Sequence, residues 1–271
     1  MTPLGNILRR PWRALQTNWL REWSIRAAIR EQGLWATVRY LEGVVPDIDD
    51  QYTSFKLNTP YERLKVRGLH AFQMGLVKDA LLTFSTTWGP RSVVDLGDSA
   101  GTHTAYVLAY CKALGMDAPR CRSANSDSEA VKRINDRGMY ARTADIVDGG
   151  IVWQDNLAMC FETLEHLKNP IKALRHMAYC KRLVLTVPWV RRSRVATVGT
   201  WPEGSHVFEL SPEDWGRVLE RAGWQILRSR IYRQYPRWHP WGWLLRRWWR
   251  AWDYEGFWGA VVKPIQLESG K

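Results

Sequence analysis

The stretch Ser92-Val93-Val94-Asp95-Leu96-Gly97-Asp98-Ser99-Ala100-Gly101-Thr102-His103-Thr104 decides the fold of this chain. It begins with a short apolar run, which predicts a buried strand. Gly97 and Gly101 then permit a sharp turn and a close approach to the backbone. Ser99 and Thr102 suit the cap of a following helix, and such a helix start offers free N–H groups and a positive dipole end. We therefore expect a nucleotide-like ligand at the end of this strand.

Three kinds of site use a turn of this type. The first is a binding loop for S-adenosylmethionine, with Asp95 at the end of the strand. The second is a hydrolase nucleophile elbow, because residues 97–101 fit the pattern G-x-S-x-G with Ser99 as nucleophile. The third, a dinucleotide loop, requires G-x-G-x-x-G and is excluded because Ser99 replaces the second glycine. The turn alone does not separate the first two.

Composition limits the class of protein. The chain has 271 residues, 45% of them apolar, which suits one large domain, or one domain with appendages. No apolar run reaches the length of a membrane span, and Arg9, Arg10 and Arg13 interrupt any signal-peptide core. The four cysteines fit no metal spacing, so we expect cytosolic thiols and no metal site.

Charge and tryptophan content are both high. The net charge is +12 and there are 17 tryptophans. A basic surface favours anionic partners such as nucleic acid, anionic lipid or a phosphorylated substrate, and tryptophan with arginine suits a membrane–water interface. No nucleic-acid recognition motif is present, so we do not expect a nucleic-acid partner. We expect a cytoplasmic protein, with peripheral attachment to the inner face of a membrane as an open alternative.

From Ser92 onward the pattern alternates strand and helix, which predicts βαβ units and a mostly parallel sheet. Expected strands cover residues 92–96, 120–125, 139–143, 157–161, 182–187, 225–232 and 257–262. Expected helices cover residues 102–114, 128–136, 162–177 and 212–222. Because Pro236, Pro240 and Gly242 disfavour a regular crossover, the last strand is expected to be antiparallel. The predicted fold is α/β and Rossmann-like, with seven strands and an N-terminal helical extension.

Two segments lie outside this alternation. Residues 1–68 form a basic helical extension, with residues 46–58 as a polar linker, and residues 69–271 form the main domain with an insertion at 233–255. Residues 236–252 of the insertion hold six tryptophans and four arginines. The extension and the insertion either pack their tryptophans on the domain or lie on an anionic membrane.

Four sequence motifs, in this order along the chain, resemble those of a class I S-adenosylmethionine-dependent methyltransferase over about residues 70–263. The first is the turn already quoted. The second, Asn125-Ser126-Asp127-Ser128-Glu129-Ala130-Val131, looks like the family's D-x-S-x-E-A-V. The third, Cys160 to Pro170, is close to E-x-L-E-H-L-x-x-P. The fourth is LVLTVP at 183–188, followed by Ser205 to Glu213 and Ala-Gly-Trp at 222–224. The branch resembled includes quinone- and glycan-modifying O-methyltransferases.

The resemblance implies a set of cofactor-binding residues. Asp95 would bind donors near the amino-acid end, and Asn125 stands where the family has an acid for the ribose hydroxyls, with one acceptor oxygen in place of two. Asp145 is placed to accept from the adenine amino group. The full implied set is Asp95, Gly97, Asp98, Ser99, Gly101, Asn125, Ser126, Asp145, Cys160 and Phe161.

The resemblance also implies methyl transfer to a small-molecule, glycan or lipid-linked acceptor. Histidine titrates near neutral pH, so His206 is a candidate general base, with Glu162 and His166 in reserve; each also suits a structural role. Arg191, Arg192 and Arg194 suit an anionic group on the acceptor. Two alternatives stay open: a noncatalytic scaffold, since Asn125 departs from the family, and a hydrolase using Ser99, Asp145 and His206.

Overall fold

The computed structural model describes residues 19–53, 56–84, 89–149, 152–195, 206–252 and 254–265. Seven of its strands form one sheet in the order β3-β2-β1-β4-β5-β9-β8, with β9 antiparallel to both neighbours and the other pairs parallel. The strands are β1 Ser92–Leu96, β2 Arg120–Asn125, β3 Ala141–Thr143, β4 Leu157–Phe161, β5 Arg182–Pro188, β8 Trp224–Arg233 and β9 Gly256–Pro264. The predicted Rossmann-like fold with an antiparallel last strand is confirmed.

Side chains alternate between the two faces of the sheet, as the two-residue period of a strand requires. Val93 of β1 joins the apolar cluster on one face, and its neighbour Val94 joins the cluster on the other. The same alternation separates Met159 from Cys160 in β4. Because both faces are apolar, helices must cover both.

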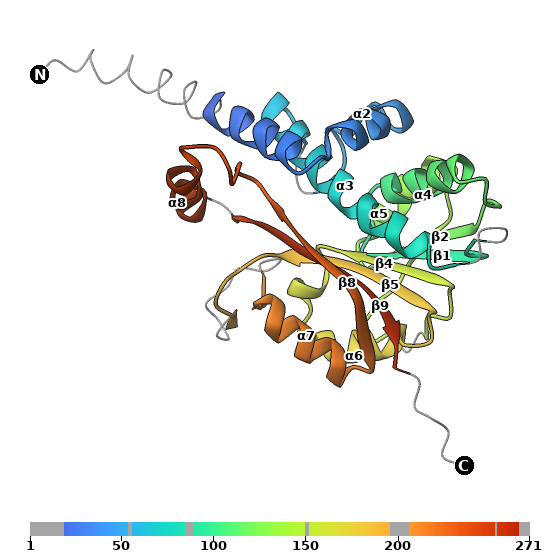
Figure 1. Ribbon diagram of the computed structural model, residues 1–271. Helices are drawn as coiled ribbons and strands as arrows, with labels where there is room; N and C mark the ends of the chain where they lie inside the picture. The colour runs from blue at the N-terminus through green and yellow to red at the C-terminus, as the bar shows by residue number, and fades with distance from the viewer. Residues whose placement is uncertain are drawn as a thin grey trace, which may run out of the picture.

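Helices cover each face (Figure 1). The first face carries α3 and α4 together with α2 and a helix over residues 19–31, and the opposite face carries α6 and α7. The helices are α2 Trp35–Val44, α3 Pro60–Leu81, α4 Thr102–Ala113, α5 Ser128–Asp136, α6 Pro170–Met177, α7 Pro212–Arg221 and α8 Gly242–Trp252. A capping box at Thr59 and Glu62, with Pro60 in the first turn, fixes where α3 begins.

One predicted helix is wrong at its start. We expected a helix from Glu162 to about Met177, but Glu162 adopts a positive φ of 50°. A single 3-10 turn, η1 Leu164–His166, follows, and α6 begins only at Pro170. The reason is local, because the Asn169 side chain accepts from the Lys172 N–H and Pro170 occupies the first helical turn. Residues 162–166 are thereby free to form a turn at the carboxyl edge of the sheet.

Residues 46–53, expected as part of a polar linker, are anchored along the molecule; we call them the strap. Ile48 and Gln51 are buried. Arg63 binds Asp49 at 2.5 and 2.6 Å, and Arg137 binds Asp50 at 2.6 and 2.7 Å. The strap therefore joins α3 to the far end of α5 and crosses the carboxyl edge of the sheet.

Candidate functional site

The site is centred on the turn between β1 and α4. Gly97 has φ 89°, and a Cβ atom there would lie 2.1 Å from Thr163 Oγ1, so no other residue fits without displacing its neighbours. Gly101, with φ 75°, caps α4 without a side-chain hydrogen bond. The first-turn N–H groups of α4 are thus left without a side-chain cap, which suits an anion or a carbonyl oxygen.

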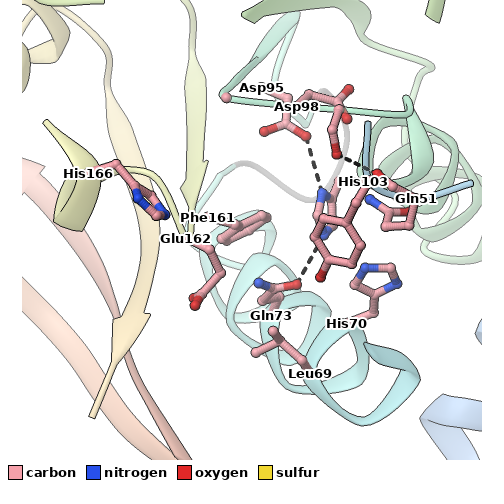
Figure 2. Close-up of a pocket in the computed structure, with 13 residues that line it drawn as sticks. Gln51, Leu69, His70, Gln73, Asp95, Asp98, His103, Phe161, Glu162 and His166 are labelled. Carbon is pink, nitrogen blue, oxygen red and sulfur yellow. Dashed lines mark hydrogen bonds and ion pairs between the residues drawn. The ribbon is translucent and has the colours of Figure 1, made fainter. Parts of the chain in front are cut away.

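A first cavity of about 240 Å³ opens beside this turn. Four regions build its wall: the turn with the start of α4, one face of α3, the end of β4 with the 162–166 turn, and the strap (Figure 2). The lining residues are Gln51, Tyr52, Leu69, His70, Gln73, Asp95, Gly97, Asp98, Ser99, His103, Phe161, Glu162 and His166. The volume is below the roughly 300–1,000 Å³ of ordinary ligand pockets, because Gln51 and Tyr52 of the strap form part of the wall.

The strap is held to the turn by hydrogen bonds. The Ser99 hydroxyl donates to the Gln51 carbonyl at 2.6 Å, and the Thr102 hydroxyl donates to Gln51 Oε1 at 2.7 Å. Thr53 donates to Asp127 at 2.6 Å. These bonds fix the strap over the ends of β1 and β2.

A row of buried, polar side chains runs along the wall of the first cavity from β1 to β5. His103 Nδ1 lies 3.4 Å from Asp95 Oδ2, and its Nε2 lies 3.0 Å from Gln73 Oε1 (Figure 2). Gln73 Nε2 donates to the Thr186 hydroxyl at 3.0 Å. Because an amide oxygen can only accept, the His103 tautomer that pairs with Gln73 Oε1 carries a proton on Nε2. This row holds α3 and α4 in register with the sheet at the cavity wall.

The charge on Asp95 is costly in this environment. Burial, and then the nearby Asp98 carboxylate, raise the pKa of Asp95 to about 6, while His103 opposes the shift. Asp95 Oδ2 makes no hydrogen bond of good geometry. Burial also lowers the pKa of His70 well below its usual value, with His103 and Arg67 adding to the shift. A ligand that brings a positive or donating group to Asp95 would relieve this cost.

A second cavity of about 200 Å³ adjoins the first and shares Tyr52, Leu69, Glu162 and His166 with it. Its remaining lining comes from α3, from the 162–166 turn, and from the segments around β5, the short strand β7 Phe208–Glu209, and β9: Lys65, Val66, Glu165, Pro188, His206, Tyr254 and Phe257. The shared residues make a common wall, so a group bound in one cavity faces the other.

His206 is oriented by two partners in the second cavity. Its Nδ1 lies 3.1 Å from Glu209 Oε1 and 2.6 Å from the Tyr254 hydroxyl, and Tyr254 also donates to Glu209. Glu209 is almost completely buried, while the His206 side chain is 17% exposed. A carboxylate at Nδ1 favours the tautomer whose Nε2 is unprotonated. This is the arrangement in which a histidine accepts a proton from a substrate.

The 162–166 turn contributes two carboxyl groups, Glu162 and Glu165, to the cavity that His206 lines. Burial raises the pKa of Glu162 to about 8, with the Thr186 hydroxyl and Lys65 opposing. Burial, and then the charge of Glu162, raise the pKa of Glu165 well above its usual value. Glu165, His166 and His206 place ligand atoms within 4.8 Å of one another, a donor set that a divalent cation would accept.

Of the proposed cofactor-binding residues, Asp95, Gly97, Asp98, Ser99 and Phe161 line the first cavity. Gly101 lies behind the turn, where a Cβ atom would meet Met139 Cε at 2.1 Å. Cys160 is fully buried in the apolar cluster on the α6 and α7 side. Of the proposed catalytic residues, Glu162 and His166 line both cavities, and His206 lines the second.

Asn125, Ser126 and Asp145 lie at the carboxyl ends of β2 and β3, outside both linings. Asn125 Nδ2 donates to the Gly97 and Asp98 carbonyls at 3.3 and 2.8 Å, and its Oδ1 accepts from the Asp127 N–H. Asp145 accepts from the N–H groups of Val147 and Asp148. Ser126 is exposed. Asn125 therefore ties β2 to the β1 turn.

The hydrolase triad is not assembled. Ser99 donates to the strap, Asp145 accepts from its own turn, and His206 Nδ1 faces Glu209. The residue near the turn that sequence reasoning missed is His103, whose only signal was its place in the first turn of a helix after Gly101. The strap residues Gln51 and Tyr52, and Tyr254, carried no signal at all, because their roles depend on long-range packing.

The first cavity fits the amino-acid end of S-adenosylmethionine. Asp95 offers a buried carboxylate oxygen without a good donor, and the uncapped start of α4 offers N–H groups. The ammonium and carboxylate of an amino acid are the groups that such donors and acceptors bind. At the β2 end, the acceptor oxygens of Asn125 and Asp127 are engaged in the protein's own hydrogen bonds.

Comparison with known proteins agrees with this geometry. Residues 69–229 match the model of a methyltransferase domain family. No curated protein matches the chain.

Solved structures share the fold at low identity. The 4+2 cyclase SpnF has 15% identity and a TM-score of 0.54, covering 84% of this chain and 93% of its own. Magnesium protoporphyrin IX methyltransferase from Synechocystis, with S-adenosylhomocysteine bound, has 13% identity and a TM-score of 0.51, covering 89% and 98%. A putative sarcosine dimethylglycine methyltransferase from Galdieria sulphuraria has 11% identity and a TM-score of 0.52, covering 85% and 98%. At these identities the likeness shows the fold.

Proposed function

The chain belongs to the class I S-adenosylmethionine-dependent methyltransferases, and we propose that it methylates a hydroxyl group of a glycan or lipid-linked acceptor held in the second cavity. The observation that supports a hydroxyl acceptor is the pairing of His206 with buried Glu209 beside a cavity that adjoins the cofactor cavity. A hydroxyl must lose its proton during methylation, and this pairing provides a base.

The cofactor supplies a methyl group on a positively charged sulfur, which is reactive enough that the protein mainly orients and excludes water. Asp95 and the start of α4 would hold its amino-acid end, and the Gly97 turn would lie against it. Phe161 and Leu69 give the first cavity an apolar wall. The strap closes the cavity from the solvent side through Gln51 and Tyr52.

In the second cavity, His206 would accept the acceptor's proton at Nε2, while Glu209 and Tyr254 hold Nδ1. Glu162 stands in the wall common to both cavities, and its raised pKa keeps much of it protonated and neutral at pH 7. A neutral wall avoids a second negative charge beside a hydroxyl that is losing its proton.

The acceptor class rests on the lining of the second cavity. Lys65 lies among polar groups there, together with the apolar Val66, Leu69 and Phe257. Such a mixture suits a ring or sugar that carries hydroxyl and anionic groups next to an apolar portion. Of the arginines first considered for the acceptor, Arg191 lines a separate depression with Arg230 and Arg233. The acceptor class agrees with the quinone- and glycan-modifying branch that the sequence resembles.

The proposed location is the cytoplasm. All four cysteines are free, which agrees with a reducing compartment. Among the described residues, no helix is long and apolar enough to cross a bilayer.

The test uses methyl-labelled S-adenosylmethionine with the purified chain and two acceptor pools, an organic lipid extract and a water-soluble glycan extract. We expect label in one pool as a methyl ether, which survives mild base, whereas a methyl ester releases methanol. His206→Ala should lose the transfer and keep cofactor binding. Label in neither pool with intact cofactor binding would favour the noncatalytic scaffold, and base-labile label would contradict a hydroxyl acceptor.

A further inference from the structure

An apolar, tryptophan-rich surface lies where α8 meets the helix over residues 19–31. Trp19, Trp238, Trp241 and Trp243 are 69%, 78%, 61% and 62% exposed, and Leu244 is 47% exposed. We call these five residues the tryptophan surface. Single exposed apolar residues are ordinary, but several large aromatic side chains gathered in one place mark an interaction surface.

The tryptophan surface stands on a fixed base. On the inner side of α8, Leu245 and Trp249 are buried in the core, and Trp249 Nε1 donates to the Ser24 hydroxyl at 2.9 Å. Glu31 accepts from the backbone N–H groups of Arg237 and Trp238 at 2.7 and 3.0 Å. The backbone that carries the outward indoles is therefore held in place before any partner binds, which reduces the backbone entropy lost on binding.

These burial values change which tryptophans are candidates for a partner. From the sequence alone, all six tryptophans of residues 236–252 are candidates for membrane contact. Trp249 is completely buried and Trp248 is half-buried against it, so both belong mainly to the base. The outward residues are those of the tryptophan surface.

A groove of about 680 Å³ runs between the two helices. Its walls are apolar or aromatic except for His239: Trp19, Leu20, Trp23, Trp241, Leu244, Leu245 and Trp248. Trp23 packs edge-on against His239 with 4.9 Å between ring centres. Such a groove suits hydrocarbon and offers almost no polar group to a peptide backbone.

Positive charge accompanies the tryptophan surface. Residues 19–31 and 235–252 contain seven arginines and two glutamates. Both glutamates are engaged within the protein, Glu22 by Arg26 at 2.6 Å and Glu31 by the backbone. Arg237 and Arg247 are exposed. A second copy of this chain would bring the same positive surface against itself, whereas anionic lipid headgroups complement it.

We infer that the tryptophan surface and its arginines dock the protein onto the interface of an anionic lipid bilayer, with the indoles among the headgroups and the groove facing the hydrocarbon. Tryptophan and arginine at one helix surface are the residues that such an interface favours. The docking does not rest on the proposed acceptor. It agrees with it, since Tyr254 and Phe257, just after α8, line the second cavity.

The experiment is flotation of the full chain with vesicles of phosphatidylcholine alone or mixed with phosphatidylglycerol, at low and high salt. We expect binding to the anionic vesicles, weakened by salt. A Trp238→Ala, Trp241→Ala, Trp243→Ala variant should lose about tenfold per tryptophan, and Arg237→Ala with Arg247→Ala about fivefold per arginine.

Matched controls change residues of the same kind elsewhere. Tyr140→Ala with Tyr179→Ala removes two exposed aromatic side chains, and Arg120→Ala removes an exposed arginine, and these should bind like the wild type. Thermal melting checks that every variant is folded. Binding to neither vesicle, binding that survives the tryptophan variant, or a concentration-dependent dimer that the same variant abolishes would each overturn the inference.

Discussion

The two cavities share a wall but are built in opposite ways. Much of the first comes from one continuous stretch, Asp95 to His103, in which a strand, a glycine turn and a helix start follow one another. The second gathers Lys65, Glu162, His206 and Tyr254 from segments that are far apart in the chain. A site built by local backbone geometry can be predicted from the sequence, and its fixed backbone restricts the ligand. A site built by long-range packing can accommodate different substrates when single side chains change.

The largest effect is expected when the second cavity alone is disabled. His206→Ala removes the base while every residue lining the first cavity stays, so kcat should fall about 10²–10⁴-fold with cofactor affinity unchanged. Steady-state kinetics measures kcat, and calorimetry of S-adenosylhomocysteine binding measures the cofactor affinity. His176→Ala, a half-buried histidine on α6, is the matched control. A parallel loss of cofactor affinity would show that the cavities do not act separately.

The converse change disables the first cavity. Gly97→Ala adds a Cβ atom 2.1 Å from Thr163 Oγ1 at φ 89°, and the clash together with the strain should weaken cofactor binding by about 100-fold or more. Gly223→Ala is the matched control, because Gly223 has the same φ of 89° but no atom lies within 4 Å of such a Cβ. It should lose about 1 kcal/mol of stability and bind normally. Equal binding defects in both variants would contradict the close approach at Gly97.

Glu162, in the wall common to both cavities, should make the stability of the fold depend on pH. In the folded protein the pKa of Glu162 is raised from 4.5 to about 8, so the folded state holds this proton more tightly than the unfolded state. The stabilisation that Glu162 gives the folded state is complete below about pH 4.5 and is lost as pH rises to about 8. Relative to the wild type, Glu162→Gln should gain up to about 1.4 kcal/mol per pH unit across that range. Urea unfolding at several pH values measures this difference.

The control for the pH series is Glu220→Gln, which changes an exposed carboxylate on α7. Its stability relative to the wild type should stay nearly constant with pH. A Glu162→Gln curve that runs parallel to the wild type would mean that the folded Glu162 ionises normally.

The smallest effect is expected at Ser99. Its hydroxyl donates to the strap carbonyl of Gln51, and Ser99→Ala removes one hydrogen bond, worth about 1 kcal/mol. Methyl transfer should therefore change by no more than about fivefold. Labelling of Ser99 by a fluorophosphonate would instead support a serine hydrolase with Ser99 as nucleophile.

Elements with strong local signals were predicted well. The strands at 92–96, 120–125 and 157–161 and the helix at 128–136 have the expected bounds, because apolar runs, glycines and caps define them locally. The helix expected from Glu162 was wrong because Asn169 and Pro170 start a helix more strongly than the apolar period before them. Three features needed the folded chain: the strap across the turn, the partnership of Tyr254 with His206, and the burial of Trp249 rather than Trp243.

The most direct test of the account is a crystal structure of the protein with S-adenosylhomocysteine. We expect the ligand in the first cavity, with its amino-acid end at Asp95 and the start of α4 and its sulfur facing the common wall at Glu162 and His166. Because the cavity holds only about 240 Å³, Gln51 and Tyr52 should be displaced from their present positions. A ligand bound elsewhere, or one whose sulfur faces away from the second cavity, would contradict the account.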